Sequence, residues 1–154
     1  MGERLLLVVI DDSPESVLAL RFAARRAAHF DGRVAMLKVI PPIQFDHWVG
    51  VAERAAEEAR EDAKRLMDDY AEKVREWGEG HDPVYLVREG LIADELVAQI
   101  EEDPNICLLV LAAAKGRNPG PLVSSIATKL VAQVKVPITV IPGNLTVEDI
   151  DPIT

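Results

Sequence analysis

Five apolar runs alternate with four longer segments of helical periodicity, and this alternation restricts the chain to a few folds. The clearest runs are residues 5–10 and 106–112, which contain no charged residue. Uninterrupted apolar runs of this length are typical of strands covered on both faces, as in parallel sheets. We therefore predict an α/β fold: a single doubly wound open sheet of five parallel strands with helices on both faces. The usual order for such strands is 3-2-1-4-5.

The same pattern gives the element boundaries. The predicted strands are residues 5–10, 33–40, 84–88, 106–112 and 136–141. The first predicted helix begins after the Asp11–Pro14 cap and ends at about Phe30. The other predicted helices cover residues 51–77, 92–102 and 122–134. Pro137 inside the last run indicates an edge strand, because proline has no amide hydrogen for a ladder. We expect one domain over residues 1–154, with 143–154 as a tail that adds a short turn.

Charge and cysteine content narrow the function classes. The formal net charge is −9, which argues against nucleic-acid or anionic-membrane binding. Residues 104–147 contain no Asp or Glu, and they carry +4 against −13 for the remainder. This stretch is either a segment suited to a small anion or simply a set of core strands and a buried helix. Cys107 lies in an apolar run, so we expect it to be buried, and we expect a cytoplasmic, reducing location.

A ligand site in this fold would lie beyond the carboxyl ends of the first and fourth strands, where the strand order reverses. Asp11 follows the first strand and offers a hydrogen-bond acceptor. The loop from Ala113 to Pro121 follows the fourth, with Ser124 and Ser125 near the start of the next helix. Glycine backbone, free helix amides and hydroxyls together suit a phosphate. The alternatives are that Asp11 only caps its helix and that the loop only turns the chain.

Several motifs, taken in order, resemble the universal stress protein family over nearly the whole chain. Asp11–Leu20 resembles Asp-Gly-Ser-x-x-Ser-x-x-Ala-Leu, and Leu37–Ile40 resembles Leu-His-Val-x. Gly90–Ala93 resembles Gly-x-Pro-Ala, and Val136–Pro142 is similar to Cys-Pro-Val-x-Val-Val-Pro. The resemblance implies a stress-response binding or signalling module that forms a homodimer through residues 136–141, from Val136 to Ile141.

The resemblance also implies ligand contacts, although the phosphate motif is degenerate. ATP-binding members carry Gly-x-x-Gly, nine residues, and then Gly-Ser or Gly-Thr. Here the motif falls on Ala113, Gly116 and the pair Ser124–Ser125, so one of three glycines is kept and the spacing is two residues short. By matching position, Asp11 and Val39 would face base and ribose, and Gly116 with the two serines would face phosphate. The changes should weaken a triphosphate site while leaving ATP or AMP as candidate ligands.

No catalytic or metal-binding set is apparent in the sequence. The three histidines, His29, His47 and His81, lack metal-ligand spacing. The function alternatives are a nucleotide-binding module, a homodimeric scaffold without nucleotide, and a slow ATPase. The aromatic segment from Phe45 to Trp48 either packs as a lid or lines a pocket, and the charged faces of helix 51–77 are expected to be solvated.

Overall fold

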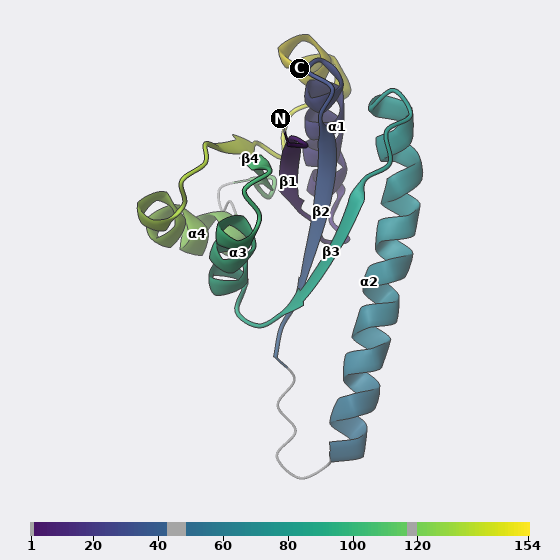
Figure 1. The fold of residues 1–154 in the computed structure, drawn as a ribbon, viewed down its shortest axis with the longest axis vertical. Helices are drawn as coiled ribbons and strands as arrows, with labels where there is room; N and C mark the ends of the chain where they lie inside the picture. Colours follow the sequence, from purple (N-terminus) through teal and green to yellow (C-terminus); the bar gives the residue numbers. More distant parts are fainter. Residues whose placement is uncertain (1, 43–48, 117–119) are drawn as a thin grey trace.

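A five-stranded parallel sheet forms the centre of the computed structural model, which describes residues 2–42, 49–116 and 120–154 (Figure 1). The strand order is β3-β2-β1-β4-β5, which confirms the predicted topology. The strands are β1 (Leu5–Val9), β2 (Arg33–Ile40), β3 (Val84–Glu89), β4 (Ile106–Ala112) and β5 (Ile138–Ile141). The helices are α1 (Pro14–Ala28), α2 (Val49–Trp77), α3 (Ile92–Glu102), α4 (Gly120–Gln133) and α5 (Val147–Ile150), followed by a 3₁₀ turn at Asp151–Ile153.

The helices cover the two faces of the sheet in pairs (Figure 1). Alternate strand side chains point to opposite faces, so β1 supplies two cores at once. Leu6 and Val8 pack into the core beneath α1 and α2, while Leu7 packs into the core that includes Leu96 of α3 and Leu130 of α4. All five β1 residues are buried, as expected for the central strand of a doubly covered sheet.

Helix α2 packs on the sheet through only part of its length. Its inward stripe of Ala63, Met67, Tyr70 and Val74 is buried, in agreement with the three-to-four-residue apolar spacing of the sequence. Polar pairs connect its outer side to the edge strand β3, including Arg60 with Glu89 at 2.6 Å. Figure 1 shows the first turns of α2 running past the carboxyl ends of β2 and β3.

Two expectations about the strands were wrong, and each has a local cause. Cys107 is exposed, not buried. Leu5 pairs with Ile106 while Leu6 pairs with Leu108, so Cys107 is the extra residue of a bulge, and the pairing of β4 with β5 starts only at Leu109. The last strand begins at Ile138, so Pro137 precedes β5 instead of lying inside it. The prediction that this strand lies at an edge is confirmed. The Phe45–Trp48 segment lies outside the described residues.

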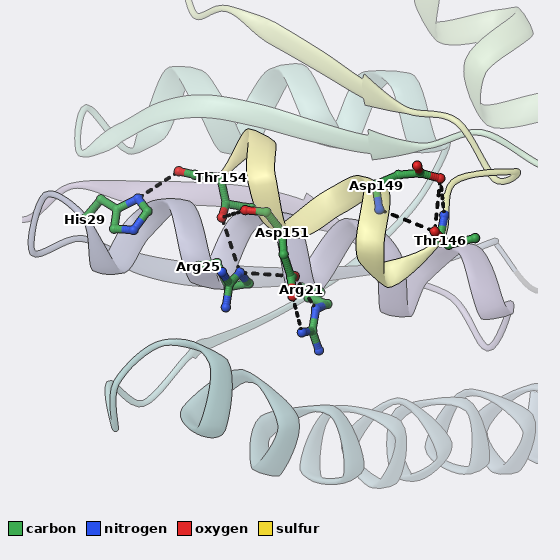
Figure 2. Close-up of polar contacts among 7 residues, drawn as sticks. All are labelled: Arg21, Arg25, His29, Thr146, Asp149, Asp151 and Thr154. Atoms are coloured by element: carbon green, nitrogen blue, oxygen red, sulfur yellow. Dashed lines mark hydrogen bonds and ion pairs between the residues drawn. The ribbon is translucent and has the colours of Figure 1, made fainter.

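The tail forms more structure than the single turn expected from the sequence. Thr146 and Asp149 form a capping box at the start of α5, and Ile150 is completely buried in the α1 core. Arg21 of α1 donates two hydrogen bonds, of 2.7 and 2.8 Å, to the Asp151 carboxylate (Figure 2). This arginine holds the pKa of Asp151 below its usual range. The tail therefore packs onto α1, and Val140 in β5 remains 42% exposed.

The buried anchor of the tail gives a stability prediction. Replacing Ile150 with Ala should lower the free energy of unfolding by about 2–4 kcal/mol, because the change opens a cavity in a closed core. Ile153→Ala is the matched control, since Ile153 is 56% exposed and should change stability by less than about 0.5 kcal/mol. Urea unfolding followed by circular dichroism measures both. Equal losses would show that the tail is not docked through Ile150.

Candidate functional site

The predicted site lies at the carboxyl edge of the sheet, where β1 and β4 run side by side. Leu7 pairs with Leu109 and Val8 with Val110, so the two strands end next to each other. The loops that leave them point the same way, one into α1 and the other toward α4. This is the reversal point of strand order, and it is where open α/β sheets bind ligands.

Asp11, the first predicted ligand residue, is held by the start of α1. Its Oδ1 atom accepts hydrogen bonds from the Ser13 amide at 2.9 Å, from the Ser16 hydroxyl at 2.8 Å, and from the Ser13 hydroxyl. The Asp11 amide in turn donates to the Ser16 hydroxyl at 3.0 Å. Partial burial opposes ionisation, but these hydrogen bonds and the nearby Lys38 ammonium hold the pKa of Asp11 below its usual range. The carboxylate is thus ionised and fixed in orientation.

The alternative that Asp11 is the N-cap of α1 is wrong. The N-cap residue of α1 is Ser13, which makes no capping bond with its own side chain. Asp11 orders this turn from two residues upstream. All the hydrogen bonds described at its carboxylate fall on Oδ1, so Oδ2 has none within the described parts of the chain.

Tyr70 of α2 supports the same turn from the other side. Its hydroxyl donates a hydrogen bond of 2.8 Å to the Asp11 carbonyl oxygen. Burial raises the pKa of Tyr70 to about 12, and the negative charges of Asp11, Asp12 and Asp69 add to this effect. Tyr70 therefore remains a neutral donor that ties α2 to the end of β1.

The loop after β4 is shaped by its contact with the end of β5. The Ala113 amide donates to the Ile141 carbonyl oxygen at 2.9 Å, so the sheet already uses it. A Cβ at Gly143 would stand 2.5 Å from the Ala113 carbonyl oxygen, so only glycine fits there. Gly116 has φ of +105°, which also favours glycine. A cavity of about 490 Å³ lies here, bounded by Ala113–Gly116 and Pro142–Asn144.

The remaining predicted residues lie at the same edge but do not all reach that cavity. Val39 is buried near the end of β2, with 7% of its surface exposed. Ser124 is exposed in the first turns of α4, and Ser125 is the next residue of that helix. The cavity lining includes Ala113 and Gly116 from the predicted set, and not Asp11, Val39 or Ser124.

Three residues that shape this edge were not singled out from the sequence. Ser16 and Tyr70 act on Asp11 through contacts five and fifty-nine residues away along the chain. Gly143 packs against the β4 loop. The Pro142-Gly143 step after the last strand was the one local signal for the third. Ser16 is the second serine of the Asp-Gly-Ser-x-x-Ser pattern that Asp11–Leu20 resembles. No sequence spacing indicates the contact of Tyr70, because that contact depends on how α2 packs.

The described residues contain neither a cluster of three or more His, Cys, Asp or Glu side chains that could hold a metal ion nor a helix long and apolar enough to cross a membrane. Among solved structures, the fold is similar to the universal stress protein UspA from Lactobacillus plantarum, at a TM-score of 0.76 and 18% identity, covering 92% of this chain and 99% of that one. No curated protein matches the sequence.

Two further solved structures resemble the chain and contain nucleotides. A universal stress protein from Archaeoglobus fulgidus in complex with dAMP aligns at a TM-score of 0.63 and 19% identity, over 90% of this chain and 97% of that one. A universal stress protein in complex with cAMP aligns at 0.65 and 16% identity, over 92% and 97%. At these identities the likeness speaks for the fold. The sequence model of the universal stress protein family matches residues 4–142, and the chain therefore belongs to this family.

Proposed function

We propose that this protein is a stress-response module that binds an adenine nucleotide with a short phosphate chain at the carboxyl edge of β1 and β4. The observation that carries the proposal is the side-by-side pairing of these strands, which starts the Asp11 turn and the glycine-bearing loop at adjacent points. A base acceptor and a backbone-lined hollow then lie at one edge of the sheet.

The base end of the site would be Asp11 with Val39. Hydrogen bonds to Oδ1 fix the Asp11 carboxylate and leave Oδ2 to accept from an exocyclic amino group such as that of adenine. Val39, at the end of β2, offers an apolar wall. A fixed, ionised acceptor gives specificity, because a base that presents an acceptor there would be repelled.

The phosphate end favours one phosphate over three. The Ala113 amide is already bonded to Ile141, and Pro119 and Pro121 have no amide hydrogen. Gly116 keeps its left-handed backbone, and Ser124 is exposed on the following helix. Lys115 lines the cavity and supplies positive charge. These donors suit AMP better than ATP, which agrees with the dAMP and cAMP bound by two structural relatives.

We expect slow turnover at most. Residues 104–147 contain no Asp or Glu, so a carboxylate that activates water would have to come from another element, such as Glu15 of α1 beside Gly143. Slow ATP hydrolysis remains the enzymatic alternative, and a scaffold without nucleotide the structural one. We place the module in the cytoplasm because its one cysteine, Cys107, is a free thiol, as a reducing compartment would keep it.

The nucleotide proposal predicts a selective loss of AMP binding in Asp11→Asn. The amide group of Asn would place a donor or a weaker acceptor toward the base, and affinity should fall about tenfold or more. Asp12→Asn is the matched control, because it removes the same charge from the adjacent position. Isothermal titration calorimetry with AMP and ATP measures both. Equal affinity of the two variants would remove Asp11 from the site, and absence of AMP binding by the unmodified protein would overturn the proposal.

We also propose a homodimer formed through β5. β5 is an edge strand of four residues, Ile138–Ile141, and Val140 is 42% exposed on it. Exposed strand edges invite pairing with a second copy, and the docked tail lies on α1. Dimerisation would then account for an apolar side chain exposed at the sheet edge.

The dimer proposal predicts that Val140→Lys yields monomers. A lysine at an edge strand opposes pairing of two copies through like charge and loss of apolar contact. Val131→Lys is the matched control, because Val131 is 69% exposed on α4, away from the edge strand. Analytical ultracentrifugation of the three proteins reports the mass. A dimeric Val140→Lys protein, or a monomeric unmodified protein, would contradict the proposal.

A further inference from the structure

A second cavity, of about 530 Å³, lies between α2 and the ends of β1 and β2. Its apolar lining comes from both sides: Ile40 at the end of β2 faces Ala63 and Leu66 on α2. Ala63 is buried and Leu66 is half-buried, so the floor of the cavity continues into the core. The volume is within the range of about 300–1,000 Å³ that small-molecule sites occupy.

This cavity is separate from the proposed nucleotide site. Successive side chains of β2 point to opposite faces of the sheet. Val39 packs into the core beneath α3 and α4, whereas Lys38 and Ile40 line the cavity on the α2 face. Asp12, but not Asp11, is among the lining residues. A ligand in this cavity would therefore bind whether or not a nucleotide is bound.

The charges around the cavity are unbalanced. It is lined by one cation, Lys38, and by three carboxylates, of Asp12, Asp62 and Asp69. Asp62 is paired with Arg65 on the surface of α2. Lys38 lies close enough to Asp11 to help lower the pKa of that carboxyl group. The charges of Asp62 and Lys38 are thus each opposed by a neighbour.

Asp12 and Asp69 are the other two carboxylates that line the cavity. Neither makes a hydrogen bond or ion pair with any residue in the described ranges. They come from different elements, Asp12 from the turn after β1 and Asp69 from α2, and both line the cavity. Both are also near enough to Tyr70 for their charges to raise the pKa of its hydroxyl. The cavity thus combines two acids with an apolar floor.

We propose that this cavity binds an apolar organic cation, an ammonium group carried on a hydrophobic body. Asp12 and Asp69 receive the ammonium group, and Ile40, Ala63 and Leu66 contact the hydrophobic body. A carboxylate ligand is disfavoured, since it would meet two unpaired acids, whereas a simple inorganic cation would leave the apolar floor unused. Lys38 opposes the ligand charge and thereby limits the affinity.

Three probes that share one hydrophobic body test the charge preference: phenethylamine, phenylalanine and 3-phenylpropionate. They carry a cation, a zwitterion and an anion at neutral pH. Titration into the ¹⁵N-labelled full chain at low salt should shift the amides of Asp12, Lys38, Ala63 and Asp69 with phenethylamine at millimolar concentration. Phenylpropionate should leave them in place, and 1 M NaCl should weaken the phenethylamine shifts.

Substitution of an acidic and of a basic lining residue should change the phenethylamine affinity in opposite directions. Asp69→Asn should weaken phenethylamine binding about threefold to tenfold, whereas Lys38→Met should strengthen it by a similar factor because a like charge is removed. Asp94→Asn, an exposed acid on α3, is the matched control and should have no effect. Asp69 is exposed on a helix, so this variant keeps the folded state even if Lys38→Met does not.

Each contrary result overturns the proposal in a distinct way. Tighter binding of phenylpropionate, or weaker phenethylamine binding in Lys38→Met, would show that Lys38 binds the ligand and that the cavity prefers anions. Tightest binding of phenylalanine would make the ligand a zwitterion. No amide shift with phenethylamine up to 10 mM would show that the cavity binds no cation of this class. Loss of AMP binding has no bearing on these outcomes.

Discussion

The pairing of β1 with β4 is the constraint that determines where the candidate site of this protein lies. The sheet extends from β1 in two directions: β2 and β3 lie on one side of it, and β4 and β5 lie on the other after a crossover. Two loops of unlike chemistry consequently begin at neighbouring points: an acidic turn at Asp11–Asp12 and an acid-free loop at Ala113–Gly116. In the proposed site the Asp11 turn would supply the base acceptor and the loop after β4 the phosphate cradle, so each loop would need the other.

Asp11 orders the fold around it and is also the proposed acceptor for a ligand. Its Oδ1 orders the first turn of α1 through Ser13 and Ser16, and its carbonyl oxygen receives the Tyr70 hydroxyl from α2. The same contacts hold the pKa of the carboxyl group low and fix its direction. A ligand that hydrogen-bonded to Oδ2 would therefore meet a carboxylate that the fold already fixes in direction, which would lower the entropic cost of binding.

The sequence allowed the sheet order, the helix pairs and the α2 stripe to be predicted, because these depend on local periodicity and on general rules of handedness. What it missed depends on contacts between distant segments. Cys107 is apolar in pattern but becomes exposed through a bulge, which depends on register with Leu5. The tail was expected to add a single turn, yet Ile150 is fully buried in the core beneath α1 and α2. At the candidate site, Asp11 and Gly116 were predicted from the sequence as ligand residues, and that role stays a prediction. The contacts of Tyr70 and Gly143 form only when α2 and β5 are in place.

The two cavities at this edge differ in charge because of the alternation of side chains along the strands. On β2, Val39 faces the α3 side and Lys38 with Ile40 faces the α2 side, so neighbouring residues belong to different environments. The α4 side takes its charge from residues 104–147, which lack acids, and the α2 side from Asp12 and a helix dense in carboxylates. The loop after β4 thus carries no acid of its own, whereas three carboxylates line the α2 cavity. Asp12 lines the α2 cavity, so a ligand that reorders Asp12 would also act on the Asp11 turn through Tyr70. The Tyr70 hydroxyl donates to the Asp11 carbonyl oxygen, and the charges of both acids raise the pKa of Tyr70.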